Sequence, residues 1–253
     1  MTADSTPDPH SYSSDAVSDS DVERVLVLAA HPDDVDFGAA GTVALWTERG
    51  IVVSYCLATS GDAGGFEDIP REAMAAMREA EQQAAAAALG VHDVEFLRFA
   101  DGALYPTMEL RKGFSRAIRR VRPQRVLIQS PEFDWSRVGA SHPDHRAAGE
   151  AAFAAVYPDA RNPYAHPELL EDEGLQAWSA HQLWIMGGPH NNMTVDITAT
   201  FDSKVAALRA HRSQTEHIHE LDALLRGFAG AAASQAGLPE GRLAEAFQVV
   251  AVT

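Results

Sequence analysis

The chain has 253 residues, which is enough for one large domain with a full hydrophobic core. Its 46% apolar and 22% charged residues are typical of a soluble globular protein and exclude a wholly disordered one. A formal net charge of −16 argues against nucleic acid as a partner, because phosphate contacts need clustered Lys and Arg. The sequence lacks both a basic and apolar leader and an apolar run of about 18 residues, so it predicts a cytoplasmic protein with no membrane insertion.

The first 21 residues are rich in Ser, Asp and Pro and contain almost no large apolar side chains. Such a segment buries too little surface to offset the entropy lost on ordering, so residues 1–21 are predicted to form a disordered acidic tail. Residues 22–253 show no repeat and no linker, and they are predicted to form one domain. The single cysteine, Cys56, lies in an apolar run with no basic neighbour and is expected to be buried and unreactive.

From residue 22 onward, apolar runs typical of buried strands alternate with segments of helical periodicity. Strands are expected at residues 24–30, 51–59, 94–99, 125–130, 181–187 and 193–197, and helices at residues 39–50, 71–90, 108–121 and 144–157. Repeated β-α-β units predict a Rossmann-like α/β fold, with a mostly parallel sheet and helices on both faces. In such a fold the ligand site lies beyond the carboxyl ends of the strands. The irregular stretch at residues 158–176 is predicted to be a functional loop over that site.

Two similar tetrads follow strands of this pattern. The first strand ends in His-Pro-Asp-Asp at residues 31–34, where a dinucleotide-binding fold would have a glycine-rich turn, and His-Pro-Asp-His at residues 142–145 opens the helix after the fourth strand. One tetrad alone would more simply supply a helix N-cap. Two at one sheet edge bring together imidazoles and carboxylates whose burial is costly unless an ion neutralises them. These donors suit a catalytic zinc with an open position for water, and also Fe²⁺ or another divalent ion.

With these tetrads and the supporting segments "TSGDAGG", "REAE" and "LRAHRSQ", the sequence resembles the PIG-L/LmbE-like superfamily of zinc-dependent N-deacetylases. The resemblance implies His31, Asp34 and His145 as metal ligands, Asp33 as the general base and His142 as the partner of the oxyanion. Independently, adjacent residues of a tight loop point in different directions, so two neighbouring carboxylates can serve as ligand and base. The two histidines of the second tetrad share a face at the helix entry, so one can bind metal while the other reaches the substrate.

Substrate-binding candidates come from three other segments. Asp62 lies in the glycine-rich loop after the second strand, and Asp101 follows the third strand. A turn role competes with substrate binding for both carboxylates. Arg78, in the long second helix, resembles a substrate-side Arg of the family, and a solvated helix face is the alternative.

Late in the chain, Lys204 and His211 are expected to lie behind the site. The spacing of His211, His217 and His219 suits a second metal only poorly.

The predicted function is metal-dependent removal of an acetyl group from an N-acetylated amino sugar or its conjugate. The predicted cofactor is Zn²⁺, and the predicted partner is a small-molecule N-acyl amino sugar, with a homo-oligomer left open. An amidase that cleaves a larger thiol conjugate of mycothiol type is the alternative within the enzymes. A nucleotide-binding module on the same scaffold is disfavoured by the missing glycine-rich turn, and a metal protein without catalysis would leave Asp33 and His142 without a task.

Overall fold

The computed structural model describes residues 21–65 and 69–252, so the predicted tail lies outside the described residues apart from Asp21. Within these ranges the strands form one seven-stranded sheet in the order β3-β2-β1-β4-β5-β7-β6. The strands are β1 (Arg24–Ala29), β2 (Val52–Thr59), β3 (Asp93–Phe99), β4 (Arg125–Gln129), β5 (Gln182–Met186), β6 (Met193–Asp196) and β7 (Ala244–Ala251). The α-helices are α1 (Asp34–Glu48), α2 (Arg71–Ala88), α3 (Met108–Val121), α4 (Pro143–Ala154), α5 (Glu168–Glu171), α6 (Phe201–Ala210), α7 (Arg212–Thr215) and α8 (Leu221–Gln235).

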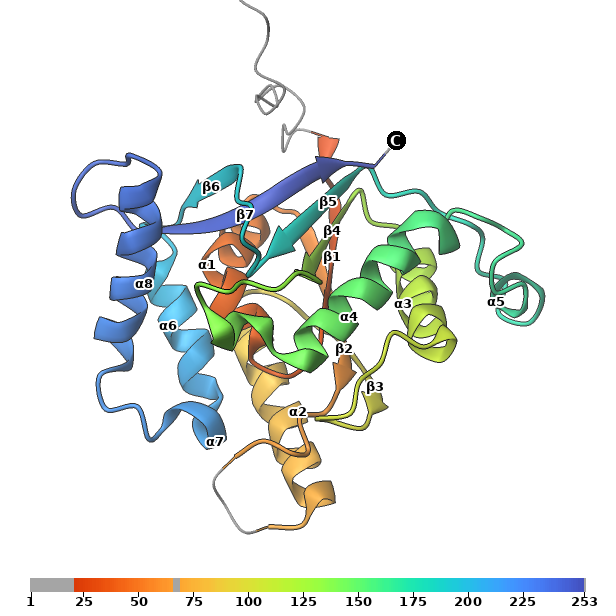
Figure 1. The fold of residues 1–253 in the computed structure, drawn as a ribbon, viewed down its shortest axis with the longest axis horizontal. Coiled ribbons are helices and arrows are strands. Elements are labelled where there is room, and N and C mark those ends of the chain that lie inside the picture. Colours follow the sequence, from red (N-terminus) through yellow and green to blue (C-terminus); the bar gives the residue numbers. More distant parts are fainter. Residues whose placement is uncertain (1–20, 66–68, 253) are drawn as a thin grey trace, which may run out of the picture.

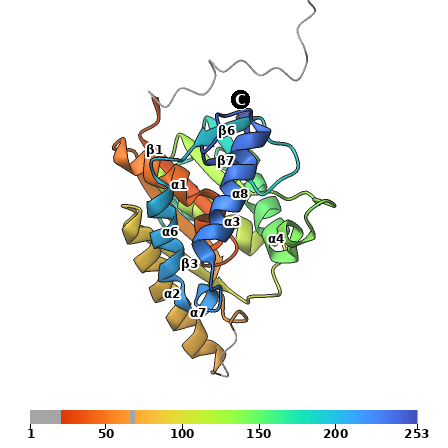
Figure 2. The same ribbon diagram turned by 90° about the vertical axis from the view of Figure 1, so that its left-hand side faces the viewer.

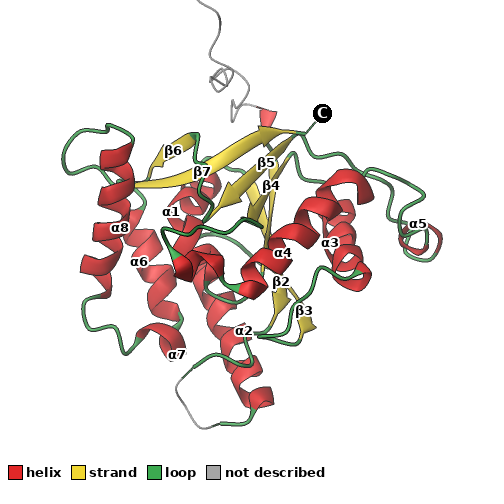
Figure 3. Cartoon of the chain, viewed as in Figure 1, coloured by secondary structure: helices red, strands yellow, loops and turns green. Residues whose placement is uncertain are grey.

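The sheet is mostly parallel, as predicted (Figure 3). Strand β1 pairs in parallel with β2 and β4, while β3 and β5 extend the parallel part on either side. Strand β7 runs antiparallel to both β5 and β6. The carboxyl ends of five parallel strands therefore meet at one edge of the sheet.

Helices cover both faces of the sheet, and the side chains of β1 explain why. Val25, Val27 and Ala29 point into the core beneath α1, α2 and α6. Leu26 and Leu28 point into the opposite core, beneath α3 and α4. Figure 1 shows α3 and α4 on one side of the sheet. Figure 2 shows α6 beside α8, and α2 lies next to α6. The predicted Rossmann-like fold is confirmed, and none of the described helices is long and apolar enough to cross a bilayer.

The individual elements follow the sequence pattern closely in the first half of the chain. Helix α3 has the predicted bounds. Gly50 and Gly90, the predicted ends of the first two helices, have φ angles of 83° and 76°, in the left-handed region that glycine adopts freely. Helix α1 begins at Asp34 rather than residue 39, so the first tetrad runs directly into it. Cys56 is fully buried in β2, as expected.

Candidate active site

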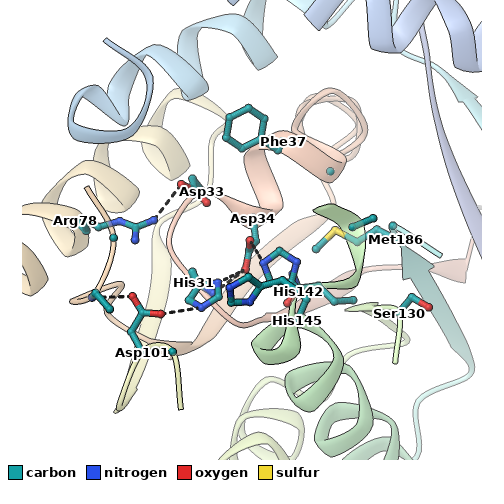
Figure 4. A pocket seen from close by; sticks show the side chains of 17 residues that line it. His31, Asp33, Asp34, Phe37, Arg78, Asp101, Ser130, His142, His145 and Met186 are labelled. Atoms are coloured by element: carbon teal, nitrogen blue, oxygen red, sulfur yellow. Dashed lines mark hydrogen bonds and ion pairs between the residues drawn. The ribbon is translucent and has the colours of Figure 1, made fainter. Parts of the chain in front are cut away.

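A cavity of about 610 Å³ lies beyond the carboxyl ends of the parallel strands, where the topology predicts a site (Figure 4). Residues of both tetrads line it, together with loop residues that follow β2, β3, β4 and β5. The lining residues include His31, Asp33, Asp34, Phe37, Gly64, Arg78, Asp101, Ser130, His142, His145 and Met186. The structure therefore brings together all five residues predicted as metal ligands or catalytic groups.

Asp34 lies between two imidazoles. Its Oδ1 is 2.9 Å from Nε2 of His145, and its Oδ2 is 3.4 Å from Nδ1 of His31 (Figure 4). The main-chain N–H of His31 donates a hydrogen bond of 2.7 Å to the same Oδ2. Burial disfavours the charged form of Asp34, but His145 and His31 hold its pKa well below the ordinary value. This carboxylate is therefore ionised and faces two nitrogen donors.

The far side of the His31 ring is held by two more carboxylates. Its Nε2 lies 3.0 Å from Oδ1 of Asp101 and 3.2 Å from Oδ2 of Asp144. Burial lowers the pKa of His31, but the carboxylates of Asp34, Asp101 and Asp144 outweigh burial and raise it to about 12. The position thus calls for a positive charge, which a proton or a metal cation supplies. A histidine that ligates a metal usually donates its other N–H to a carboxylate, and the ring of His31 has this arrangement.

His142 completes a group of imidazoles at the cavity. Nitrogens of His31, His142 and His145 lie within 4.8 Å of one another. Burial, followed by the other two histidines, lowers the pKa of His142 and favours its neutral form. Its Nδ1 accepts a hydrogen bond of 3.2 Å from the main-chain N–H of Asp144, so Nε2 carries the proton of the neutral ring. Among the described residues, two groups have ligand atoms close enough together for one metal ion: His31 with His142 and His145, and His31 with Asp101 and Asp144. Asp34 belongs to neither group, so its role as a ligand stays a prediction.

Asp33 faces a different partner from Asp34. Its φ of 86° lies in the left-handed region, which costs a residue other than glycine roughly 1–3 kcal/mol and turns its side chain away from its neighbour. The Asp33 Oδ2 accepts a hydrogen bond of 3.0 Å from Nη2 of Arg78. Burial and the charge of Asp34 raise the pKa of Asp33 to about 6, against the lowering effect of Arg78. The two adjacent carboxylates are therefore placed for different tasks.

Arg78 is buried at 4% exposure, so the alternative of a solvated helix face is wrong. Besides Asp33, its guanidinium donates to the carbonyl oxygens of Pro32 at 2.7 Å and Gly61 at 3.0 Å. The glycine-rich loop wraps around it, since a Cβ added at Gly61 or Gly64 would lie 2.4 Å from Nη1 of Arg78. The absence of side chains in this loop is what admits the guanidinium to the cavity wall.

The two predicted substrate-side carboxylates lie in different places. Asp101 lines the cavity, where it contacts His31 and accepts a hydrogen bond of 2.8 Å from the N–H of Ala63. Asp62 is not among the lining residues, and its carboxylate accepts hydrogen bonds from Arg71 at 2.7 Å and from the N–H of Asp101 at 3.2 Å. The contact of Asp144 with His31 was not predicted from the sequence. The one feature of the sequence that pointed to Asp144 was its position between the two histidines of the second tetrad.

Lys204 and His211 contact α1, through the carbonyl of Phe37 and the carboxylate of Asp36 respectively, and their support of the site stays a prediction. Lys204 is buried, with 4% of its surface exposed. Its ammonium group donates hydrogen bonds to the carbonyl oxygen of Phe37 at 2.7 Å and to the carboxylate of Glu245 at 2.6 Å. Glu245 in turn accepts hydrogen bonds from the main-chain N–H groups of Gly41 and Thr42. His217 and His219 are exposed, and both groups of described residues with metal-ligand spacing contain His31 instead.

The prediction that residues 158–176 cover the site is wrong. No residue of this stretch lines the cavity, and α5 within it lies at the far edge of the molecule, beyond α3 (Figure 1). The buried guanidinium of Arg119 donates to the carbonyl oxygens of Asp159, Ala160, Asn162 and Ala165. These bonds hold the stretch against α3, so its length reflects packing there.

Comparison with known proteins agrees with this geometry. Residues 26–156, which contain both tetrads, match the family model described as "PIG-L: GlcNAc-PI de-N-acetylase". The chain belongs to the PIG-L de-N-acetylase family. The diacetylchitobiose deacetylase of Thermococcus kodakarensis is 34% identical to it over 79% of this chain and 74% of that protein. The predicted superfamily is therefore confirmed.

Two further relatives are similar to this chain over most of its length. The probable N-acetyl-alpha-D-glucosaminyl L-malate deacetylase 2 of Bacillus cereus is 32% identical over 78% of this chain and 86% of its own length. The structure of the N,N'-diacetylchitobiose deacetylase from Pyrococcus horikoshii, complexed with its inhibitor MPG, superposes with a TM-score of 0.83 at 29% identity, covering 92% of this chain and 85% of that one. These relatives are N-deacetylases, which confirms the predicted hydrolase class and does not favour the amidase alternative.

Proposed function

We propose that this protein is a zinc-dependent deacetylase of an N-acetylated amino sugar or its conjugate. The observation that carries the proposal is the placement of Asp34 between His31 and His145, with a second, separately held carboxylate, Asp33, in the same cavity. The relatives named above deacetylate N-acetylated sugars, which supports the same substrate class here.

His31, Asp34 and His145 would hold the cation. Two imidazoles and one carboxylate are a common ligand set for catalytic zinc, and they leave a position open for substrate or water. When bound there, the cation would polarise the amide carbonyl and acidify a water molecule. The remaining steps fall to side chains of this chain.

Asp33 is proposed as the general base that accepts a proton from the attacking water and returns it to the nitrogen of the leaving amine. Its left-handed backbone and its bond to Arg78 keep its carboxylate apart from Asp34, which such a role requires. His142 is proposed to donate from Nε2 to the oxyanion that forms when the carbonyl is attacked. Its Nδ1 already accepts from the N–H of Asp144, which holds the ring in the tautomer that can donate.

Asp62, Arg78 and Asp101 are proposed to act on the substrate side of the site. Arg78 and Asp101 lie in the cavity wall, and their contacts with Asp33 and His31 support a role in orienting those two groups. The contacts of Asp62 with Arg71 and with the N–H of Asp101 support a role in shaping the loop. The cytoplasmic location and a homo-oligomeric state stay predictions.

The test is an acetate-release assay on the purified chain with N-acetylglucosamine and N,N'-diacetylchitobiose as substrates. We expect release by the zinc-loaded protein, loss of release after chelation, and recovery when Zn²⁺ is added back. Release that survives complete removal of metal would contradict the metal-dependent mechanism. Turnover of bulky thiol conjugates without release of acetate from any N-acetyl sugar would favour the amidase alternative.

A further inference from the structure

The backbone of Asp33 is held from outside its own loop. Its φ of 86° is a conformation that residues other than glycine rarely adopt, so neighbouring groups must keep it there. Its side chain is held by Arg78 of α2. One turn further along the same helix, Gln82 accepts a hydrogen bond of 2.8 Å from the main-chain N–H of Asp33 through Oε1. Residues four apart share a helix face, so α2 holds both the side chain and the backbone of Asp33.

The Gln82 amide can be oriented in only one way. Because the N–H of Asp33 is a donor, the amide oxygen must face it, and Nε2 must then find an acceptor on its other side. That acceptor is Oδ2 of Asp36 at 2.9 Å, which also lies 2.8 Å from Nε2 of His211. The side chains of Gln82, Asp36 and His211 are all fully buried, so no water competes for these bonds. A polar chain thus runs from His211, between α6 and α7, through Asp36 of α1 and Gln82 of α2 to the backbone of Asp33.

We propose that Gln82 is a positioning residue for the reaction, acting through Asp33. It fixes the left-handed backbone that directs the Asp33 carboxylate away from Asp34, and the buried pair of Asp36 and His211 fixes Gln82 in turn. Gln82 does not line the cavity, so it acts without touching the substrate. The inference depends on the proposed role of Asp33 as general base.

The test replaces Gln82 by Met, which has a similar length and cannot accept the hydrogen bond from Asp33. Hydrogen-bond partners that orient metal-binding residues typically contribute 10–100-fold to metal affinity or activity, and we expect a similar factor in kcat for a partner that orients the proposed base. We expect kcat for acetate release to fall by about 10–100-fold, with KM and the bound metal per chain unchanged. In the metal-free protein, hydrogen exchange at the amide of Asp33 should become faster, and this readout does not depend on turnover.

Gln83→Met is the matched control, because Gln83 is the exposed neighbour of Gln82 on the same helix. It should leave kcat and the amide exchange of Asp33 at the parent values. The proposal is wrong if kcat in Gln82→Met equals that of the control, or if KM or metal content changes in place of kcat. Gln82→Ala is a second variant with the same expected loss of kcat. If neither variant folds, Gln82 serves the fold alone and the proposal is overturned, whereas an inactive parent enzyme would count against the proposed function itself.

Discussion

Replacing Asp33 by Asn separates the proposed base from the proposed metal ligands. The amide keeps the shape of the side chain but cannot accept a proton from water. Removing a general base typically lowers turnover 10²–10⁴-fold, which corresponds to about 3–5 kcal/mol of lost transition-state stabilisation. The buried guanidinium of Arg78 still donates hydrogen bonds to the carbonyl oxygens of Pro32 and Gly61 in this variant. We therefore expect a loss of stability of only about 1–3 kcal/mol, the range for one hydrogen bond to a charged group.

The measurement is kcat for acetate release, with metal content determined on the same samples. Metal content should match that of the parent, because Asp33 lies outside the donor set of His31, Asp34 and His145. Asp159→Asn is the matched control, since Asp159 is buried and paired with Arg111 at 2.8 Å but does not line the cavity. It should lower stability to a similar degree and leave kcat unchanged. Full turnover by Asp33→Asn would refute the assignment of the base.

Four further changes test the metal centre and the packing of the fold. His145→Ala should lower the bound metal per chain, measured by elemental analysis, and an unchanged stoichiometry would show that the ligand is wrongly assigned. Adding Mg²⁺ to the chelated protein should restore less acetate release than adding Zn²⁺, because imidazole ligands favour zinc. Gly149→Ala should lower the free energy of unfolding by about 1–3 kcal/mol in denaturant titrations, since its Cβ would lie 2.4 Å from the carbonyl oxygen of Gln129. Gly227→Ala in α8, where a Cβ meets no atom within 4 Å, should instead stabilise the helix by up to about 1 kcal/mol.

Much of the candidate site could be predicted because its chemistry is local in the sequence. Each tetrad is four consecutive residues at a strand end or helix start, and a parallel sheet brings such ends to one edge. The apolar runs around Val27 and Leu127 predicted the strands that carry them, since fully buried parallel strands leave a continuous apolar signal. The different partners of Asp33 and Asp34 agree with the prediction that adjacent residues of a tight loop point in different directions.

The residues that support these groups could not be predicted in the same way. Glu245 and Gln82 contact α1 and its preceding loop from positions 203 and 49 residues away along the chain, and no periodicity marks such pairs. Strand β7 alternates buried with half-buried residues over much of its length, which is a weaker signal than a continuous apolar run, and it pairs antiparallel with β5. The prediction for residues 158–176 was wrong because it was based on the length of the stretch. Arg119 holds this stretch through bonds to main-chain carbonyl oxygens, and every residue type has such an oxygen, so the sequence does not mark these contacts.

The ion pair of Lys204 with Glu245 has a consequence for the order in which the molecule assembles. Neither charge can be buried without the other, because an unpaired ion in the interior is strongly unfavourable. Glu245 also occupies N–H groups of α1, the helix that begins at Asp34. During synthesis, the segment that carries the first tetrad leaves the ribosome early, yet we expect it to settle only after β7 has emerged. We therefore expect the residues of the first tetrad to be made early and to reach their final places late.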